Sequence, residues 1–424
     1  MVDKSVAIIT LGCKVNQYES DSIALELEKR GFSVVRGLEK ASYYVLNTCA
    51  VTNEGERKSR GQIAKILKIN PNAKIYVCGC ASELNATNFQ GRPNVCYITG
   101  VQGKMKIVNA IEGDLFGTNI EELSKEYDDS MQSKQTRTRA FIKIQDGCNS
   151  FCSYCIIPYL RGRSRSRSVE SIKSELDQIS SREVVFAGVD LSQYGNDLPG
   201  KPKLEDVIEL MRGREARFRF SSLEMGTITP NVLKVLSTLS NFCPHFHLSM
   251  QSGCDSVLKR MNRKHMAADY EECVREIRKV FPNAAITTDV ICGFPGETEE
   301  EAEKTFEFCK KINFFEMHIF PYSIRKGTVA ASLPNQITGD VKKARVSKLE
   351  ELAGTQKAAY IEKQIGTVAE VLVEKIDGHT AEGYSKNYVR TLVENCNKTV
   401  KIGDIILCKV SGANSDFAIA KYQK

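Results

Sequence analysis

Three cysteines in the middle of the chain restrict its possible folds more than any other feature. Cys148, Cys152 and Cys155 form a C-x3-C-x2-C pattern, with Gly147 before it and Pro158 shortly after it. A cubic iron–sulfur cluster normally takes four cysteine thiolates. Three neighbouring thiolates without an obvious fourth therefore predict a [4Fe-4S] cluster with one open iron, which can bind a small molecule. A zinc site is the alternative, but zinc prefers two C-x2-C pairs and this loop has one.

The length and composition limit the class of protein. A chain of 424 residues is too long for one ordinary domain and predicts two or three. The 59 lysines and arginines only slightly outnumber the 52 aspartates and glutamates, which permits a nucleic-acid partner without requiring one. The 15 cysteines are not spaced like a disulfide scaffold, and the sequence shows no signal peptide and no long apolar run. We therefore expect a cytoplasmic protein with reduced thiols and no membrane partner.

The first part of the chain alternates between two kinds of hydrophobic pattern. Strand patterns occupy residues 6–11, 43–46 and 74–77, and helical patterns occupy residues 19–30 and 53–68. Strands that alternate with helices in this way predict an open α/β sheet with parallel strands.

A second set of cysteines follows these strands. Cys13, Cys49 and Cys80 each stand just past the carboxyl end of one predicted strand. Those ends gather at one edge of an open parallel sheet, where ligands bind. The three thiolates therefore predict a second [4Fe-4S] cluster with an open iron, and the alternative is three unrelated thiols in separate loops. Cys78 competes with Cys80 for the third place, but it ends a strand pattern and is expected to point into the core.

Strand patterns continue through the middle of the chain and again alternate with helical ones. Six of them are recognisable, at residues 141–145, 183–189, 217–222, 245–250, 285–291 and 316–323. Repeated strand–helix units predict a partial TIM-like (βα)6 barrel, in which the carboxyl ends of the strands carry the chemistry. The first of these strands leads directly into the loop of Cys148.

The segments on either side of this region have different patterns. Residues 113–138 lose periodicity and predict a linker with a short helix. From Gly366, short alternating strands with Gly and Asn turns predict a small β-barrel. The expected fold class is therefore α/β, with an open parallel sheet domain at residues 1–125, the partial barrel at residues 135–360 and the small β-barrel at residues 362–424.

A basic run, RGRSRSRS at residues 161–168, follows the cysteine loop. Runs of charge are usually solvated surface, but one beside a predicted cluster is also a candidate contact for a polyanion such as RNA. The charges of the small β-barrel nearly cancel, so charge alone does not decide which of the two segments contacts RNA.

Motifs along nearly the whole chain resemble those of the methylthiotransferases, a family of radical S-adenosylmethionine (SAM) enzymes. The loop DGCNSFCSYC fits the radical SAM signature C-x3-C-x-aromatic-C, with Tyr154 at the aromatic position. LGCKVNQYES, LNTCAVTNEGERKSR and VCGCASE resemble the cluster domain of that family, and the tail resembles the RNA-binding TRAM module. Further shared motifs are FAGVDLSQYG, FSSLE, HLSMQSGCDSVLKRMNR, TTDVICGFPGETEEE and HIFPYSIRKGTVA.

This resemblance implies two [4Fe-4S] clusters and SAM as cofactors. The first cluster would cleave SAM reductively to a 5′-deoxyadenosyl radical, and the second would carry the sulfur species. The implied ligands of the first cluster are Cys148, Cys152 and Cys155, and those of the second are Cys13, Cys49 and Cys80. The implied contacts to the adenine, methionine and ribose of SAM are Tyr154, Gly188 and Glu224, respectively. The resemblance also implies tRNA as a partner and flavodoxin or ferredoxin as the electron donor, and it leaves the sulfur donor open.

The opening motif also bears on the substrate. GCKVNQYES resembles the branch that methylthiolates carbon 2 of N(6)-threonylcarbamoyladenosine beside the tRNA anticodon. The branch acting on N(6)-isopentenyladenosine has GCQMN there, and the branch acting on a ribosomal protein side chain has GCPKN, so both stay alternatives. The remaining alternatives are a radical SAM enzyme of another class, such as a methylase, and a zinc-dependent RNA-binding protein without catalytic activity.

Overall fold

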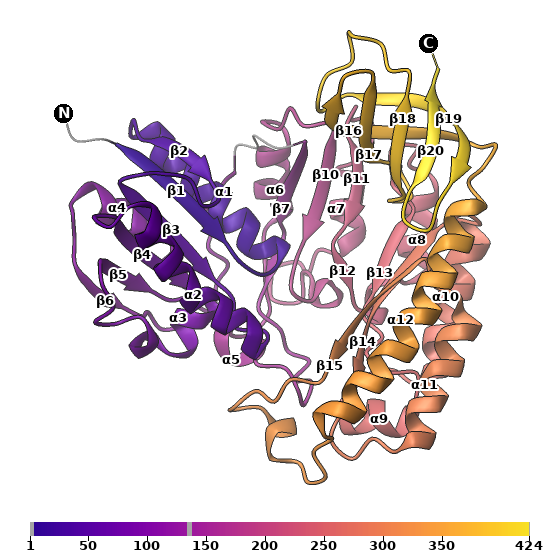
Figure 1. The fold of residues 1–424 in the computed structure, drawn as a ribbon, viewed down its shortest axis with the longest axis horizontal. Helices are drawn as coiled ribbons and strands as arrows, with labels where there is room; N and C mark the ends of the chain where they lie inside the picture. Colours follow the sequence, from indigo (N-terminus) through magenta and orange to yellow (C-terminus); the bar gives the residue numbers. More distant parts are fainter. Residues whose placement is uncertain (1–3, 134–137, 424) are drawn as a thin grey trace.

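The computed structural model of the protein describes residues 4–133 and 138–423. A six-stranded sheet forms the N-terminal part, a partial barrel the centre and a small closed barrel the C-terminal part (Figure 1). The predicted fold class is therefore confirmed. The expected boundaries at residues 1, 135 and 424 lie outside the described residues.

All strands of the N-terminal sheet are parallel. Their order is β2 (Ser33–Arg36), β1 (Ser5–Thr10), β3 (Tyr43–Thr48), β4 (Lys74–Gly79), β5 (Val95–Thr99) and β6 (Gly117–Asn119). Every residue of the central strand β3 is buried, because apolar layers cover both faces of the sheet. Helices α1 (Lys14–Lys29) and α4 (Lys106–Glu112) belong to one layer, and α2 (Asn53–Ile69) belongs to the other.

Helix α1 differs from its prediction, which began at residue 19. The helix starts at Lys14, directly after Cys13, whose backbone is extended. Asn16 and Glu19 lie in its first turns, and both are almost fully buried. Sequence patterns recognise a helix from its apolar residues, so buried polar side chains hid the start of this one.

Six wall positions form the central partial barrel, as predicted. They are β7 (Arg139–Lys143), β10 (Glu183–Ala187), β11 (Arg217–Phe220) with its continuation β12 (Ser222–Leu223), β13 (His245–Leu248), β14 (Ala285–Cys292) and β15 (Glu316–Pro321). Alternate strand residues, such as Phe186 and Phe218, join the apolar core under the outer helices. Their polar neighbours along each strand therefore face the inside of the barrel.

The C-terminal part is a closed barrel that covers the amino ends of these strands (Figure 1). Its strands are β16 (Val368–Asp377), β17 (Thr380–Tyr384), β18 (Arg390–Glu394), β19 (Ile405–Ala413) and β20 (Ala418–Tyr422). The guanidinium of Arg217 donates to the carbonyl oxygens of Glu370 (2.9 Å) and Tyr384 (2.8 Å). Hydrogen bonds of this kind join the C-terminal barrel to the barrel at the centre.

The carboxylate of Glu183 organises the cations at this junction. Glu183 is fully buried and accepts hydrogen bonds from Nε of Arg217 (2.6 Å) and Nε of Arg219 (2.9 Å), and it pairs with Arg139. Burial alone raises the pKa of Glu183, but the three arginines outweigh burial and hold its pKa well below the usual range. The carboxylate is thus charged at neutral pH.

Two further expectations concern connecting segments. The linker predicted to contain a short helix instead contributes strand β6 to the sheet, and the described residues 114–133 form no helix. Residues 134–137 of that linker lie outside the described part. Among the described residues, no helix has the length and apolar character needed to cross a membrane.

We predict that Glu183→Gln destabilises the fold by about 3–5 kcal/mol, because three buried arginines lose their shared counter-charge. Since the pKa of Glu183 is depressed, its contribution to stability is present above pH ~4.3 and is lost as the pH falls. Urea unfolding at pH 7 and at about pH 3 measures both effects. Glu209→Gln, which removes an exposed carboxylate paired with Arg212, is the matched control and should change stability little. Equal urea midpoints for the two variants would contradict this account of the junction.

Candidate active site

The loop of Cys148 is closed at its base by a short pair of strands. β8 (Gln145–Asp146) pairs with β9 (Arg165–Ser166), so the chain leaves the barrel wall and returns to it. Gly147 has a φ of +72°, and a Cβ there would meet the carbonyl oxygen of Arg163 at 2.0 Å. Only glycine fits this close approach of two backbone segments. Ser153 then fastens the loop to the barrel by donating to the carbonyl oxygens of Met261 (2.9 Å) and Arg260 (2.8 Å).

The three thiols of this loop lie close enough to act electrostatically on one another. The sulfur of Cys148 accepts a hydrogen bond from the backbone N–H of Ser150 (3.3 Å), and the sulfur of Cys152 accepts one from Arg263 Nη1 (3.4 Å). Burial, with smaller contributions from neighbouring thiols, raises the pKa of Cys148 to about 11 and that of Cys155 to about 12. Iron would supply the positive charge that favours their thiolate forms. The donor set therefore fits a cluster.

The second set of cysteines meets at the carboxyl edge of the N-terminal sheet. Cys13 precedes α1, Cys49 follows β3, and Cys80 begins the short helix α3 (Cys80–Leu84). Burial, with smaller contributions from Cys13 and Cys49, raises the pKa of Cys80 to about 11. A Cβ on Gly12 would meet the sulfur of Cys49 at 2.9 Å, so Gly12 leaves space beside that sulfur. Cys78 is fully buried in the core, as expected.

The cluster ligands themselves stay a prediction. Among residues 4–133 and 138–423, no three His, Cys, Asp or Glu side chains are placed closely enough to hold a metal ion. The structure brings each predicted triplet of thiols into one region, and it does so from the strand ends and the loop that the sequence indicated.

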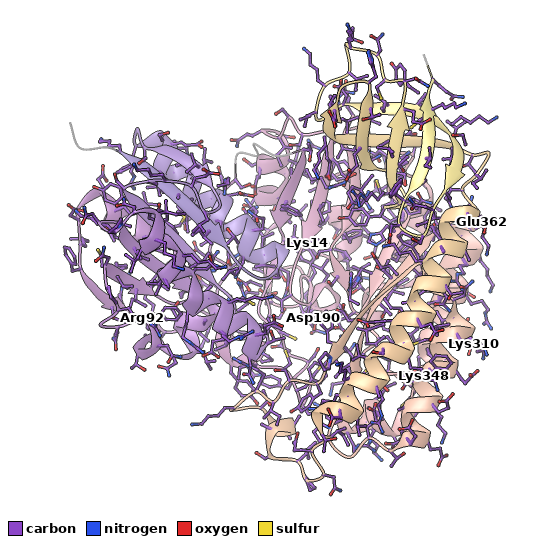
Figure 2. All side chains as sticks on the ribbon, in the orientation of Figure 1. Lys14, Arg92, Asp190, Lys310, Lys348 and Glu362 are labelled. Atoms are coloured by element: carbon purple, nitrogen blue, oxygen red, sulfur yellow. The ribbon has the colours of Figure 1, made fainter. Side chains whose placement is uncertain are left out.

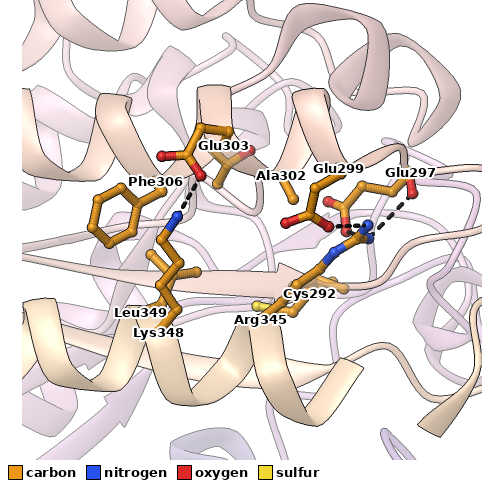
Figure 3. A pocket seen from close by; sticks show the side chains of 11 residues that line it. Cys292, Glu297, Glu299, Ala302, Glu303, Phe306, Arg345, Lys348 and Leu349 are labelled. Atoms are coloured by element: carbon orange, nitrogen blue, oxygen red, sulfur yellow. Dashed lines mark hydrogen bonds and ion pairs between the residues drawn. The ribbon is translucent and has the colours of Figure 1, made fainter. Parts of the chain in front are cut away.

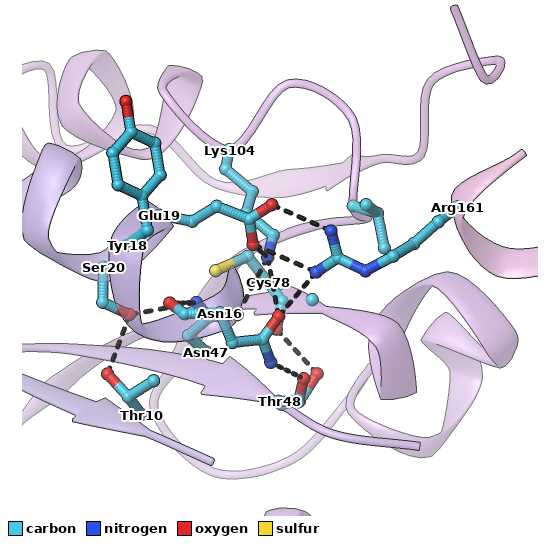
Figure 4. Close-up of polar contacts among 12 residues, drawn as sticks. Thr10, Asn16, Tyr18, Glu19, Ser20, Asn47, Thr48, Cys78, Lys104 and Arg161 are labelled. Atoms are coloured by element: carbon cyan, nitrogen blue, oxygen red, sulfur yellow. Dashed lines mark hydrogen bonds and ion pairs between the residues drawn. The ribbon is translucent and has the colours of Figure 1, made fainter. Parts of the chain in front are cut away.

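Two polar side chains that the sequence analysis missed hold the second set of cysteine loops. Asn16 Nδ2 donates to the carbonyl oxygens of Leu11 (2.8 Å) and Thr48 (2.9 Å), which joins the loops of Cys13 and Cys49. The hydroxyl of Thr48 accepts from the backbone N–H of Ala81 (3.1 Å), next to Cys80. Figure 4 shows both side chains. Their signal in the sequence was their place inside the motifs LGCKVNQYES and LNTCAV.

A buried ion network joins the two sets of cysteines. Arg161, at the end of α5 (Ile157–Arg161), donates to Glu19 Oε1 (3.0 Å), Asp146 Oδ1 (2.9 Å) and Asn16 Oδ1 (2.7 Å). Its guanidinium also lowers the pKa of Cys80 against the effect of burial. Asn16 and Glu19 belong to the N-terminal part, whereas Asp146 and Arg161 belong to the loop of the first cysteine set. Figure 4 shows Asn16, Glu19 and Arg161 together. Arg161 thus contacts both parts of the chain at once.

Two lysines complete this network around Glu19. Lys104 and Lys143 both pair with its carboxylate, and Lys143 Nζ also lies 3.2 Å from Asp146 Oδ2. Burial raises the pKa of Glu19, but Arg161, Lys104 and Lys143 outweigh burial and hold the pKa well below the usual range. The carboxylate therefore stays charged, although its side chain is only 1% exposed.

The basic run after the loop does not form a basic surface. Arg161, Arg165 and Arg167 are buried, with at most 3% of each residue exposed, and each has internal partners. Arg163 is the exposed member, and its guanidinium lies over the ring of Phe151. Three of the four arginines in this run serve the interior, so the run offers RNA a single exposed cation.

A cavity beside the cysteine loop is the candidate SAM site. Its volume is about 240 Å³, and its lining includes Ser150, Cys152, Glu224 and Arg263. Glu224 is paired with Arg263 (2.6 Å), the same arginine that donates to the sulfur of Cys152. Burial raises the pKa of Glu224, and Arg263 opposes this. Arg263 is a site residue that the sequence analysis did not single out, although the quoted motif HLSMQSGCDSVLKRMNR ends on it.

The other two predicted SAM contacts have structural surroundings of their own. Tyr154 packs beside the apolar group that contains Phe294 and Tyr322. A Cβ on Gly188 would meet Leu191 at 2.4 Å, and the side-chain carbonyl of Gln145 accepts hydrogen bonds from the two backbone N–H groups that follow Gly188. The glycine is thus explained by a tight turn, and both SAM contacts stay predictions.

A second hollow, between α11 (Glu299–Ile312) and α12 (Gly339–Glu362), is too small for a nucleoside. Its volume is about 20 Å³, and ion pairs such as Arg345 with Glu297 (2.8 Å) cross it (Figure 3). These ion pairs fasten α12 to the outside of the barrel.

Comparisons with known proteins agree with this geometry. The model of the radical SAM superfamily matches residues 142–309, and the model of the uncharacterized protein family UPF0004 matches residues 5–100. Threonylcarbamoyladenosine tRNA methylthiotransferase MtaB of Bacillus subtilis (strain 168) is 35% identical over 96% of this chain and 93% of its own length. The protein of the same name from Chlamydia pneumoniae is 37% identical over 89% of each chain.

A relative named for a different substrate is also similar. The tRNA-2-methylthio-N(6)-dimethylallyladenosine synthase of Caldicellulosiruptor saccharolyticus is 33% identical over 95% of this chain and 87% of its own length. Among solved structures, the radical SAM methyltransferase TsrM from Kitasatospora setae matches with a TM-score of 0.55 and 13% identity, over 78% of this chain and 77% of its own. That likeness shows the fold. The extent and identity of the curated matches show that this chain belongs to the tRNA methylthiotransferase family of radical SAM enzymes.

Proposed function

We propose that this protein methylthiolates carbon 2 of N(6)-threonylcarbamoyladenosine next to the anticodon of tRNA. The observation that carries the proposal is the joining of two cysteine triplets, from two parts of the chain, by the buried contacts of Arg161 with Asn16, Glu19 and Asp146. Curated relatives of similar length named for this activity support the substrate. N(6)-dimethylallyladenosine is the second candidate, because relatives of 33% identity are named for it.

The chemistry of the substrate explains the need for two sites. The C–H bond at carbon 2 of adenine offers no acidic proton, so acid–base catalysis alone does not activate it. Two [4Fe-4S] clusters and SAM would supply radical hydrogen abstraction and a methylthio group. The protein's task is then to hold both sites around one base and to exclude water.

Specific residues of this chain perform that task. Cys148, Cys152 and Cys155 would hold the SAM-cleaving cluster. Cys13, Cys49 and Cys80 would hold the second. Tyr154, Gly188 and Glu224 are the proposed SAM contacts, and Arg263 orients Glu224 beside Cys152. A low-potential donor such as flavodoxin or ferredoxin would reduce the first cluster, and the sulfur donor stays open.

Cysteine substitutions separate the two sites. We expect Cys148→Ala to abolish SAM cleavage, because its triplet loses a ligand. Cys49→Ala should keep SAM cleavage and stop sulfur transfer. Formation of 5′-deoxyadenosine and mass spectrometry of tRNA nucleosides measure the two steps. Cys78→Ala, which removes a buried core thiol next to the same site, is the matched control and should keep both activities. Full methylthiolation by Cys49→Ala would refute the second cluster.

Iron content tests the same assignment without activity. Anaerobic reconstitution should give about eight irons in the native chain and about four in a Cys13→Ala, Cys49→Ala, Cys80→Ala variant, since each cluster holds four. Iron analysis together with electron paramagnetic resonance of the reduced protein measures this. Zinc without iron in the native chain would instead support an RNA-binding protein.

The network at Arg161 is tested by Arg161→Lys, which keeps the charge but loses the fork of donors. We expect SAM cleavage in the absence of tRNA to stay near the native rate. Methylthiolation should fall on the order of 100-fold, because a misplacement of about 1 Å between the sites is enough for such a loss. If this variant methylthiolated tRNA at the native rate, Arg161 would not be needed to position the two sites.

A further inference from the structure

Lys14 occupies a position that helix stability does not explain. It is the first residue of α1 and follows Cys13 directly. Helix N-termini carry partial positive charge, so a lysine in the first turn is unfavourable for the helix itself. Figure 2 shows Lys14 on α1 where this helix approaches the central barrel. The side chain therefore has to be explained by what lies across from it.

The surroundings of the Lys14 ammonium belong to the inside of the central barrel. The charged groups that act on it most strongly are Arg219, Arg139, Glu183 and Asp289, and each of them lies on a barrel strand. Lys14 is half-buried, and no residue in the described part of the chain forms a hydrogen bond or ion pair with its ammonium group. Among the described residues its ammonium group thus has no direct ion-pair partner, and the charged groups that influence it lie on barrel strands.

The other charges in this region leave positive charge in excess. Four cations face three carboxylates: Lys14, Arg139, Arg217 and Arg219 against Glu183, Glu374 and Asp289. Nη2 of Arg139 and Nη1 of Arg219 are buried without a hydrogen-bond partner among the described residues. Both guanidinium groups lie over the ring of Tyr388. Unsatisfied buried donors are costly, and an acceptor that entered this region would offset that cost. One added carboxylate would balance the charge.

The inner wall next to these cations remains accessible. Asp289 has a side chain that is 27% exposed and lies 3.3 Å from Nε2 of His247. His318, beside Asp289 on the neighbouring strand, is exposed, and its ring lies 5.5 Å from that of His247. Polar groups of this wall can thus contact a ligand that enters beside Lys14.

The substrate proposed above has a matching group. A threonylcarbamoyl substituent joins threonine through its amino group, so its carboxylate is free, whereas a dimethylallyl substituent is an uncharged hydrocarbon. We propose that the Lys14 ammonium binds this carboxylate and thereby selects an anionic N6 substituent over an apolar one. This inference rests on the proposed function and names the residue that reads its substrate.

The test uses the reconstituted full chain and two anticodon stem-loop RNAs. One carries threonylcarbamoyladenosine, and the other carries the same group with its carboxylate converted to a primary amide. The native protein should prefer the acid by about 10- to 100-fold in kcat/KM, the range expected for a charge-assisted hydrogen bond. The Lys14→Met protein should lose that preference, because its kcat/KM falls only on the acid RNA. Lys14→Arg should restore most of the preference.

Three further measurements distinguish a loss of carboxylate recognition from other effects of the Lys14 substitution. RNA binding by fluorescence anisotropy should show the same loss of preference in Lys14→Met. Iron content and SAM cleavage without RNA should stay native, which excludes an effect through Cys13. Lys29→Met, at the exposed far end of the same helix, should behave as the native protein.

Defined results overturn the inference. Equal native rates on the acid and the amide would show that the carboxylate is not read. Equal losses on both RNAs in Lys14→Met, with loss of iron, would show that Lys14 supports the cluster instead. A native protein that modifies dimethylallyladenosine RNA and ignores the acid would refute the proposed function itself, and this result is distinguishable from the other two.

Discussion

The buried pairing of Arg161 with Glu19 and Asp146 is the interaction on which the rest of the structure depends. Burying such charges is costly, and removal of one partner leaves the others uncompensated. A hydrophobic contact could hold the two parts together, but it would not set their relative position as closely. Directional hydrogen bonds from one guanidinium fix two carboxylates and Asn16 together. Through Asn16 the same contact reaches the loops of the second cysteine set.

Several arginines of this protein lie in its interior. Arg161, Arg165 and Arg167 serve the cysteine loop and its neighbours, and the arginines around Glu183 join the central and C-terminal barrels. Nearly all of these guanidinium groups have carboxylate or carbonyl partners. The Lys14 ammonium, on α1, has no such partner among the described residues, and this difference identifies it as a candidate for contact with substrate.

The alternation of strands and helices, the cysteine loop and the closed C-terminal barrel were predictable, because each depends on residues close in the chain. Strand β17 was missed because its sequence, TAEGY, lacks a run of apolar side chains, and the prediction also left out strands β2 and β5. The start of α1 was missed because Asn16 is polar yet buried. At β17 and at the start of α1, tertiary contacts outweigh local preference.

The order of residues alone predicted which thiols could serve as ligands, the strand ends that carry them and the chemistry they favour. Tertiary structure decided which side chains connect and surround those donors. Arg161 meets Glu19 across 142 positions of the chain, and Lys14 meets barrel strands more than a hundred residues away. No periodicity or motif spacing encodes such pairs, because they form only when separately folded layers dock and their buried charges must find partners.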